Sequence, residues 1–166
     1  THAKENKDCQ GMGTTVVAAI LTADFITFAH IGDSRGYLFN KSGFVQKTVD
    51  HSLVNELVRT GQITDEEAEH HPRKNVLLRA LGTEECISVD CITINWEQGN
   101  YVLLCSDGLS NKISQVEMAE LLSEEGQVGD KVTKLVQTAN ERGGEDNITV
   151  AVIYYSEDGS EDGCHI

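Results

Sequence analysis

The chain has 166 residues, an apolar fraction of 39% and a formal net charge of −14, and this length allows one domain with a sizeable core. The acidic balance argues against nucleic acid or an acidic membrane surface as partner, because such partners attract clustered Lys and Arg, and the chain has 13 of these against 27 Asp and Glu. No apolar run reaches the roughly 18–20 residues of a membrane span, so we expect a cytoplasmic protein without membrane insertion.

Residues 14–49 show a β pattern. Four segments rich in β-branched and aromatic residues predict strands, namely Thr14–Leu21, Phe25–Ile31, Tyr37–Phe39 and Phe44–Val49. The breaks at residues 22–24 and 40–43 have hairpin length and consist of turn formers, which favours antiparallel neighbours. A doubly wound parallel sheet is therefore excluded for this half of the chain.

Residues 50–82 differ from the strands on either side. Helical spacing predicts two short helices, at residues 52–60 and 64–70, and Thr64 with Glu67 forms a capping-box pair at the start of the second. Both segments are too polar to bury much surface. We therefore expect a helical flap inserted between strands.

The second half of the chain predicts strands and helices in turn. Strands are expected at residues 87–94 and 100–105, and helices at 115–123, where Ser114 and Glu117 form a second capping box, and from residue 128 to a stop at Gly143 and Gly144. Residues 147–155 are apolar on both faces, which predicts a central strand. Antiparallel strands followed by a pair of helices indicate an α+β layered fold, and the small acidic residues 157–166 predict a disordered tail.

Three aspartates lie where a strand runs into a turn marked by glycine. Asp33 follows Gly32, Asp107 precedes Gly108, and Asp146 follows a Gly-Gly-Glu segment. Any one of these is a common turn pattern. Together, without Cys or His partners, they describe an all-oxygen site of the kind that suits Mn²⁺ or Mg²⁺, and the ions would also let an acidic protein take up a phosphorylated substrate.

Five ordered motifs resemble those of PPM (type 2C) metal-dependent serine/threonine protein phosphatases. They are Gly11-Met-Gly-Thr-Thr15, His30-Ile-Gly-Asp-Ser-Arg35, Asp50-His-Ser-Leu-Val54, Ser106-Asp-Gly-Leu109 and Gly143-Gly-Glu-Asp-Asn-Ile-Thr149. The flap sequence is similar to the bacterial branch in Gram-positive organisms, in which the phosphatase opposes a membrane-anchored serine/threonine kinase. The resemblance implies a β-sandwich flanked by helices (αββα), with residues 1–156 as the phosphatase domain and residues 50–82 as its flap.

The resemblance also implies roles for single residues. Asp107 would bind the first metal and contribute to a third, Asp146 would bind the first, and Asp33 the third. Asn147 and Gly108 would support these ligands, while Arg73 and Lys74 in the flap are candidates for substrate contact. With two or three Mn²⁺ or Mg²⁺ ions, the family hydrolyses phosphoserine and phosphothreonine in proteins by attack of a water that bridges two metals.

One part of the family pattern is missing from this sequence. The opening segment of the family supplies an Asp-Gly motif that bridges two metals and an arginine that grips the phosphate, and neither occurs ahead of Gly11. We therefore expect a fragment, incomplete at the N-terminus, with weak metal binding and little activity by itself. The alternative is a non-catalytic or regulatory PPM-like module that binds a phosphoprotein. Loss of Asp33, Asp107 or Asp146 would mark such a module, and all three are present.

Other reactive residues have a structural interpretation. Adjacent His70 and His71 point to different faces of a helix, His30 lies in an apolar strand, and His51 belongs to the turn that enters the flap. The five cysteines show no Cys-x-x-Cys spacing, which argues against a zinc site or a disulfide framework. Cys105 is expected in the core.

Overall fold

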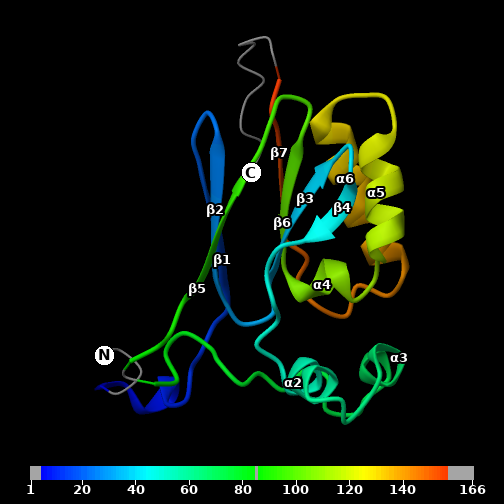
Figure 1. The fold of residues 1–166 in the computed structure, drawn as a ribbon. Coiled ribbons are helices and arrows are strands. Elements are labelled where there is room, and N and C mark those ends of the chain that lie inside the picture. The colour runs from blue at the N-terminus through cyan, green and yellow to red at the C-terminus, as the bar shows by residue number, and fades with distance from the viewer. Residues whose placement is uncertain (1–4, 85, 157–166) are drawn as a thin grey trace.

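The computed structural model describes residues 5–84 and 86–156, so the predicted acidic tail lies outside the described residues. Seven strands form two antiparallel sheets, one in the order β1-β2-β5 and one in the order β4-β3-β6-β7. Figure 1 shows the two sheets facing each other, with helices over the second sheet. The strands are β1 (Val16–Leu21), β2 (Phe25–Ile31), β3 (Arg35–Asn40), β4 (Gly43–Gln46), β5 (Asp90–Asn95), β6 (Tyr101–Cys105) and β7 (Val150–Tyr154).

The expected hairpins are present. β1 and β2 pair antiparallel from Val16 opposite Ile31 to Leu21 opposite Ile26, and the Thr22 side chain closes the turn by accepting the Phe25 N–H at 3.0 Å. β3 and β4 pair in the same manner. The sheets bury apolar side chains between them, and this inner core consists of Ile26, Phe28, Leu38, Trp96 and Val102.

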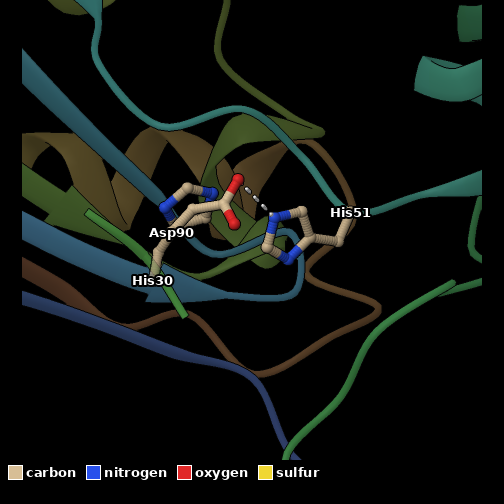
Figure 2. A group of neighbouring side chains, drawn as sticks. All are labelled: His30, His51 and Asp90. Atoms are coloured by element: carbon tan, nitrogen blue, oxygen red, sulfur yellow. Dashed lines mark ion pairs between the residues drawn. The ribbon is translucent and has the colours of Figure 1, made fainter. Parts of the chain in front are cut away.

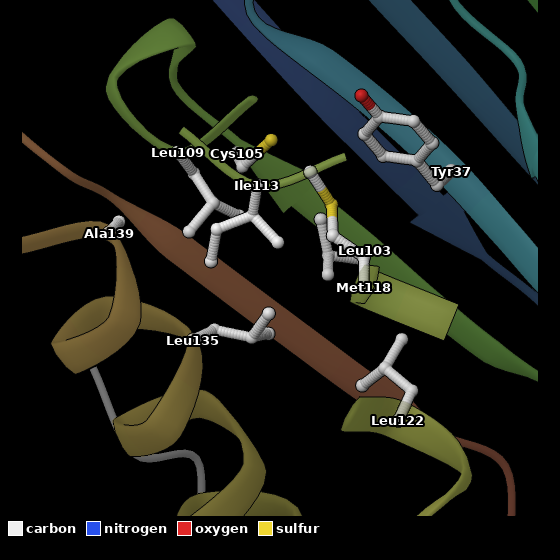
Figure 3. Packing of buried hydrophobic residues seen from close by; sticks show 9 residues of the cluster. All are labelled: Tyr37, Leu103, Cys105, Leu109, Ile113, Met118, Leu122, Leu135 and Ala139. Atoms are coloured by element: carbon white, nitrogen blue, oxygen red, sulfur yellow. The ribbon is translucent and has the colours of Figure 1, made fainter. Parts of the chain in front are cut away.

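A second core lies between the β4-β3-β6-β7 sheet and the helices α4 (Asp107–Ser110), α5 (Gln115–Ser123) and α6 (Val128–Glu141). The predicted capping box of Ser114 and Glu117 opens α5. Leu122 of α5 and Leu135 of α6 reach the same cluster as Leu103 of β6 (Figure 3). The cluster comprises Tyr37, Leu103, Cys105, Leu109, Ile113, Met118, Leu122, Leu135 and Ala139.

The outer face of the β1-β2-β5 sheet differs from that of its partner. Ile20 and Phe25, which alternate away from the inner core, are 65% and 48% exposed. In the described chain, α5 and α6 cover only the β4-β3-β6-β7 sheet (Figure 1). Residues 5–84 and 86–156 thus form three layers of an αββα arrangement.

β7 corrects one prediction. Its apolar sequence predicted a central strand, yet within the described residues it lies at the end of its sheet, paired with β6 alone. Val150 and Val152 pack on the helical side, whereas Ile153 packs on the inner core. Both faces are apolar because there is a layer on each side, and that pattern carries no information on the number of neighbouring strands.

Strand ends also differ from the sequence prediction. β4 ends at Gln46 rather than at residue 49, because the Thr48 hydroxyl accepts the Gly36 N–H and so replaces a strand contact. β5 begins at Asp90, three residues later than predicted. The short helix α4 and the 3₁₀ turn Lys7–Cys9 were not predicted, since neither is long enough to show periodicity.

The flap contains α2 (Leu53–Arg59) and α3 (Asp65–Glu69), neither of which has a buried residue. The predicted capping box of Thr64 and Glu67 opens α3. The flap connects β4 of one sheet to β5 of the other, and its helices lie beyond one end of both sheets (Figure 1). Backbone bonds from Leu53 N to Val76 O and from Leu78 N to His51 O, both 2.8 Å, hold its two ends together.

No helix in the described ranges has both the length and the apolar character required to cross a membrane.

Candidate metal centre

Three aspartates predicted as metal ligands lie at one end of the sandwich. Asp33 follows β2, Asp107 follows β6 and Asp146 precedes β7. Strand pairing fixes their common position, since Arg35 lies opposite Cys105 and Cys105 lies opposite Val150. The strands are antiparallel, so the end of β6 meets the starts of β3 and β7 at the same edge.

The charges of neighbouring aspartates affect the pKa values of Asp33 and Asp107. Burial raises the pKa of Asp33, and the negative charge of Asp107 raises it further. The pKa of Asp107 is likewise raised, first by burial and then by the charge of Asp146. Asp107 therefore lies electrostatically between the other two, and cations placed between these carboxylates would relieve the repulsion on both sides.

Asp33 and Asp107 line a cavity of about 730 Å³ between the flap and the segment that contains α4. On the flap side the lining includes Asn55 and Lys74. Of the two flap residues predicted to contact substrate, Lys74 lines this cavity, while Arg73 is outside the described lining. The cavity thus gives access to Asp33 and Asp107 from the side of the flap, whereas Asp146 is not among the residues that line it.

The close packing around residue 108 requires glycine at this position. A β-carbon on residue 108 would lie 2.4 Å from the Asn147 carbonyl oxygen, a contact that side chains essentially never make. Asn147 in turn donates its backbone N–H to the Asp146 carboxylate at 2.7 Å. Glycine thus permits the α4 turn to approach the segment that carries Asp146. The supporting roles of Gly108 and Asn147 towards a metal remain predictions.

Ser106 connects the ends of β6 and β7. Its hydroxyl donates to the Asn147 carbonyl and accepts the Thr149 N–H, both at 3.0 Å. The sequence analysis assigned no structural role to Ser106. Its place beside the Asp-Gly dipeptide was the signal of a structural role.

Arg35 and Asp50 form an ion pair. Both residues belong to the sequence motifs, but the sequence did not predict that they pair. The Arg35 guanidinium donates through Nη2 at 2.7 Å and through Nε at 3.0 Å to Oδ2 of Asp50, and Gln46 donates to Oδ1 at 3.0 Å. Burial disfavours the charged form of Arg35, but the bonds to Asp50 outweigh it and raise its pKa. The pair ties the start of β3 to the entrance of the flap.

A separate group of metal-ligand type lies beneath the flap. Donor atoms of His30, His51 and Asp90 lie within 4.8 Å of one another, and in the described ranges they form the group that meets this distance (Figure 2). The sequence analysis treated both histidines as structural, and both are buried. Cys105 lies in the core, where burial raises the pKa of its thiol to about 12, as expected of an inert thiol.

The donor set at the three aspartates consists of carboxylate oxygens, and the charge of Asp107 raises the pKa of Asp33 while the charge of Asp146 raises that of Asp107. Oxygen-rich sites of this kind suit hard divalent cations such as Mg²⁺ and Mn²⁺. These residues therefore fit divalent metal ions.

Comparison with known proteins identifies the family. Residues 1–150 match the model of the family described as protein phosphatase 2C. The chain is 47% identical to the serine/threonine phosphatase stp of Listeria innocua over 152 residues, which cover 92% of this chain and 60% of that protein. The chain thus spans about 60% of the length of this curated relative.

Solved structures agree with this result. The serine/threonine phosphatase Stp1 from Staphylococcus aureus superimposes with a TM-score of 0.88 at 39% identity, over 95% of this chain and 61% of that one. The catalytic domain of the phosphatase PstP, solved in complex with two manganese ions, gives a TM-score of 0.82 at 36% identity over 91% of this chain and 62% of that one. The chain therefore belongs to the protein phosphatase 2C family of metal-dependent serine/threonine phosphatases.

Proposed function

We propose that this chain contributes part of the metal centre of an enzyme that hydrolyses phosphoserine and phosphothreonine in proteins. The observation that carries the proposal is the electrostatic coupling of Asp33 to Asp107 and of Asp107 to Asp146, together with the cavity that Asp33 and Asp107 line. The relatives named as serine/threonine phosphatases support the same reaction. The match covers about 60% of the length of the curated relative, so the activity is proposed for the whole protein rather than for this chain alone.

The proposed ligands divide between two ions. Asp107 and Asp146 would hold one, and Asp107 with Asp33 another, which follows the order of their electrostatic coupling. When bound, such ions lower the pKa of a coordinated water and neutralise charge on phosphoryl oxygens. Manganese is a candidate because PstP was solved with it, and magnesium prefers similar oxygen donors. Asn147 and Gly108 are proposed to keep Asp146 and Asp107 in register.

The flap is proposed to contact the substrate protein. We take residues 1–156 as the phosphatase region and residues 50–82 as its flap. Lys74 lines the cavity beside Asp33 and Asp107 and could offer its ammonium group to a phosphorylated segment, while the exposed Arg73 would act from outside the lining. A cytoplasmic location remains a prediction from the hydropathy of the sequence, and a cognate serine/threonine kinase remains a prediction from the family resemblance.

The first experiment is calorimetric titration of Mn²⁺ into the chain. We expect Asp107→Asn to weaken binding most, because Asp107 is coupled to both neighbours, and Asp33→Asn to weaken it less. Asp24→Asn is the matched control, since Asp24 is exposed in the β1–β2 hairpin at the opposite end of β2. Equal Mn²⁺ affinity in Asp107→Asn and wild type would refute the ligand assignment.

The second experiment measures turnover of a phosphothreonine peptide. It compares the chain with a chimaera completed by the remaining sequence of the Listeria innocua relative. We expect manganese-dependent turnover in the chimaera and its loss with Asp107→Asn. A chimaera that binds Mn²⁺ and the phosphopeptide but turns nothing over would instead favour the non-catalytic phosphoprotein-binding module.

A further inference from the structure

His51 lies at the base of the flap and contacts the turn that carries Asp33. Its backbone N–H donates to the Gly32 carbonyl at 3.0 Å, and its ring Nδ1 accepts the Gly32 N–H at 3.2 Å. Two bonds thus hold both polar backbone groups of the residue before Asp33. His51 is only 7% exposed, so water does not replace these contacts readily.

The contacts of the two ring nitrogens with Gly32 and Asp90 together set the tautomer of His51. Because Nδ1 accepts a hydrogen bond from the Gly32 N–H, the ring of neutral His51 carries its own proton on Nε2. Nε2 lies 3.3 Å from Oδ2 of Asp90, and Figure 2 shows the carboxylate directed towards the ring. Burial lowers the pKa of His51, which favours this neutral form.

Arg79 completes the arrangement from the far end of the flap. Its Nη1 donates to Oδ1 of Asp90 at 2.9 Å, so that one carboxylate accepts from Arg79 and from His51 at the same time. Nη1 is also 3.3 Å from Nε2 of His51. Since both nitrogens carry protons in this tautomer, that approach is a contact between two donors that face the same carboxylate.

The same geometry argues against a metal ion between His30, His51 and Asp90. The Nε2 of His30 lies 2.8 Å from the Val49 carbonyl oxygen and 3.3 Å from the Val49 nitrogen, and the shorter contact places the ring proton on Nε2. The buried Nδ1, which has no hydrogen-bond partner among the described residues, is then a free acceptor. His51 has none, since the Gly32 amide occupies Nδ1 and a proton occupies Nε2. The Arg79 guanidinium already neutralises Asp90. An ion would have to displace both the amide contact and the guanidinium.

We propose that His51 is a positioning residue for the metal centre: with Asp90 fixing its tautomer, it clamps Gly32 and thereby sets the direction in which Asp33 leaves β2. The inference rests on the proposed function, because the role of Asp33 as a ligand is part of that proposal. Gly32 itself is constrained, with a φ of +97° and a hypothetical β-carbon only 2.3 Å from Thr15. The turn between β2 and β3 spans residues 32–34 alone, so a shift of Gly32 passes directly to Asp33.

The clamp also joins the metal centre to the flap. The His51 carbonyl accepts the Leu78 N–H at 2.8 Å, which closes the two ends of the flap, while the His51 side chain holds Gly32. One residue therefore belongs to the flap base and to the support of a metal ligand. Residues that support metal ligands in this manner contribute about 10–100-fold to metal affinity.

Two substitutions separate the contacts of His51. In His51→Asn the side-chain oxygen takes the place of Nδ1 and can still accept the Gly32 N–H, whereas in His51→Gln the amide takes the place of Nε2 and reaches Asp90 instead. We expect Mn²⁺ affinity within about threefold of wild type for His51→Asn and about tenfold weaker for His51→Gln. Amide exchange at Gly32 should speed up only in His51→Gln. His71→Gln, outside this network, is the control.

A third variant tests the tautomer. Asp90→Asn can accept from only one of its two donors, so we expect the ¹⁵N chemical shifts of His51 to report a loss of the Nε2–H form together with weaker Mn²⁺ binding. This variant and His51→Asn keep the test usable where His51→Gln does not fold.

The outcomes separate the two proposals. If Asp33→Asn weakens Mn²⁺ binding while all variants at positions 51 and 90 bind as wild type, the positioning role is overturned and the proposed function stands. If Asp33→Asn has no effect, the assignment of Asp33 fails and the positioning role fails with it. The inference is also overturned if the Gly32 amide exchanges at the same rate in His51→Asn and His51→Gln, regardless of the Mn²⁺ affinities of the two variants.

Discussion

Replacing Gly108 by alanine tests whether the close approach of α4 to the Asp146 segment is required. The new β-carbon would lie 2.4 Å from the Asn147 carbonyl oxygen, about 1 Å short of the 3.4 Å at which ordinary contact begins, and 3.0 Å from the carbonyl carbon. Both atoms belong to the backbone, so no flexible side chain can move aside. The strands must shift, and with them the Ser106 hydroxyl bond to the same carbonyl.

The expected cost follows from these two losses. Overpacking of this kind costs about 1–3 kcal/mol and a lost hydrogen bond about 0.5–1.5 kcal/mol, so we expect Gly108→Ala to lower the free energy of unfolding by about 2–4 kcal/mol. Urea denaturation followed by fluorescence of Trp96, the only tryptophan of the chain, measures it. Mn²⁺ affinity should fall as well, because Asp107 moves relative to Asp146.

Gly129→Ala is the matched control, since Gly129 lies within α6, where alanine is the better helix former. We expect no loss of stability there. If the free energy of unfolding of Gly108→Ala lies within about 0.5 kcal/mol of wild type, the range of ordinary surface substitutions, the turn can accommodate a β-carbon and the reasoning is refuted.

Two further substitutions test the electrostatics of the site. The pKa of Asp107 is raised in the folded chain, so its stabilising contribution is present below its unfolded pKa and is lost as pH rises through the folded value. Without metal, Asp107→Asn should therefore gain stability relative to wild type as pH rises above the ordinary pKa of 3.8, and a stability difference that is constant with pH in urea titrations would contradict the coupling. Arg35→Lys keeps the charge but loses the paired bonds to Asp50, and should cost about 1–3 kcal/mol; thermal unfolding equal to wild type would show that one ammonium group suffices.

Local signals in the sequence predicted much of this fold. The two capping boxes, Thr64 with Glu67 and Ser114 with Glu117, start α3 and α5 as expected, because the residues that form each box are close in sequence. The hairpins of the first half follow from turn residues in the same manner. The position of β7 was wrong, since burial by two layers and burial between two strands leave the same apolar pattern.

The candidate site was predictable only in part. Asp33, Asp107 and Asp146 were found because each follows or precedes a strand at a glycine turn. The contacts of His51 with Gly32 and Asp90 join residues that are 19 and 39 positions apart in the chain, and no periodicity relates such positions. The pairing of Arg35 with Asp50 depends likewise on how the flap entrance returns to β3.

The closed base of the flap has a consequence for how this protein can vary. Ser52 pairs with Leu77, and the Leu53 and Leu78 amides bond across the same gap, so the residues between them begin and end at one point of the surface. A segment of different length or sequence can be exchanged there without changing the register of either sheet, because loop closure costs little more for a longer loop. The length and sequence of the flap can therefore change while Asp33 and Asp107, which line the cavity beside it, keep their positions.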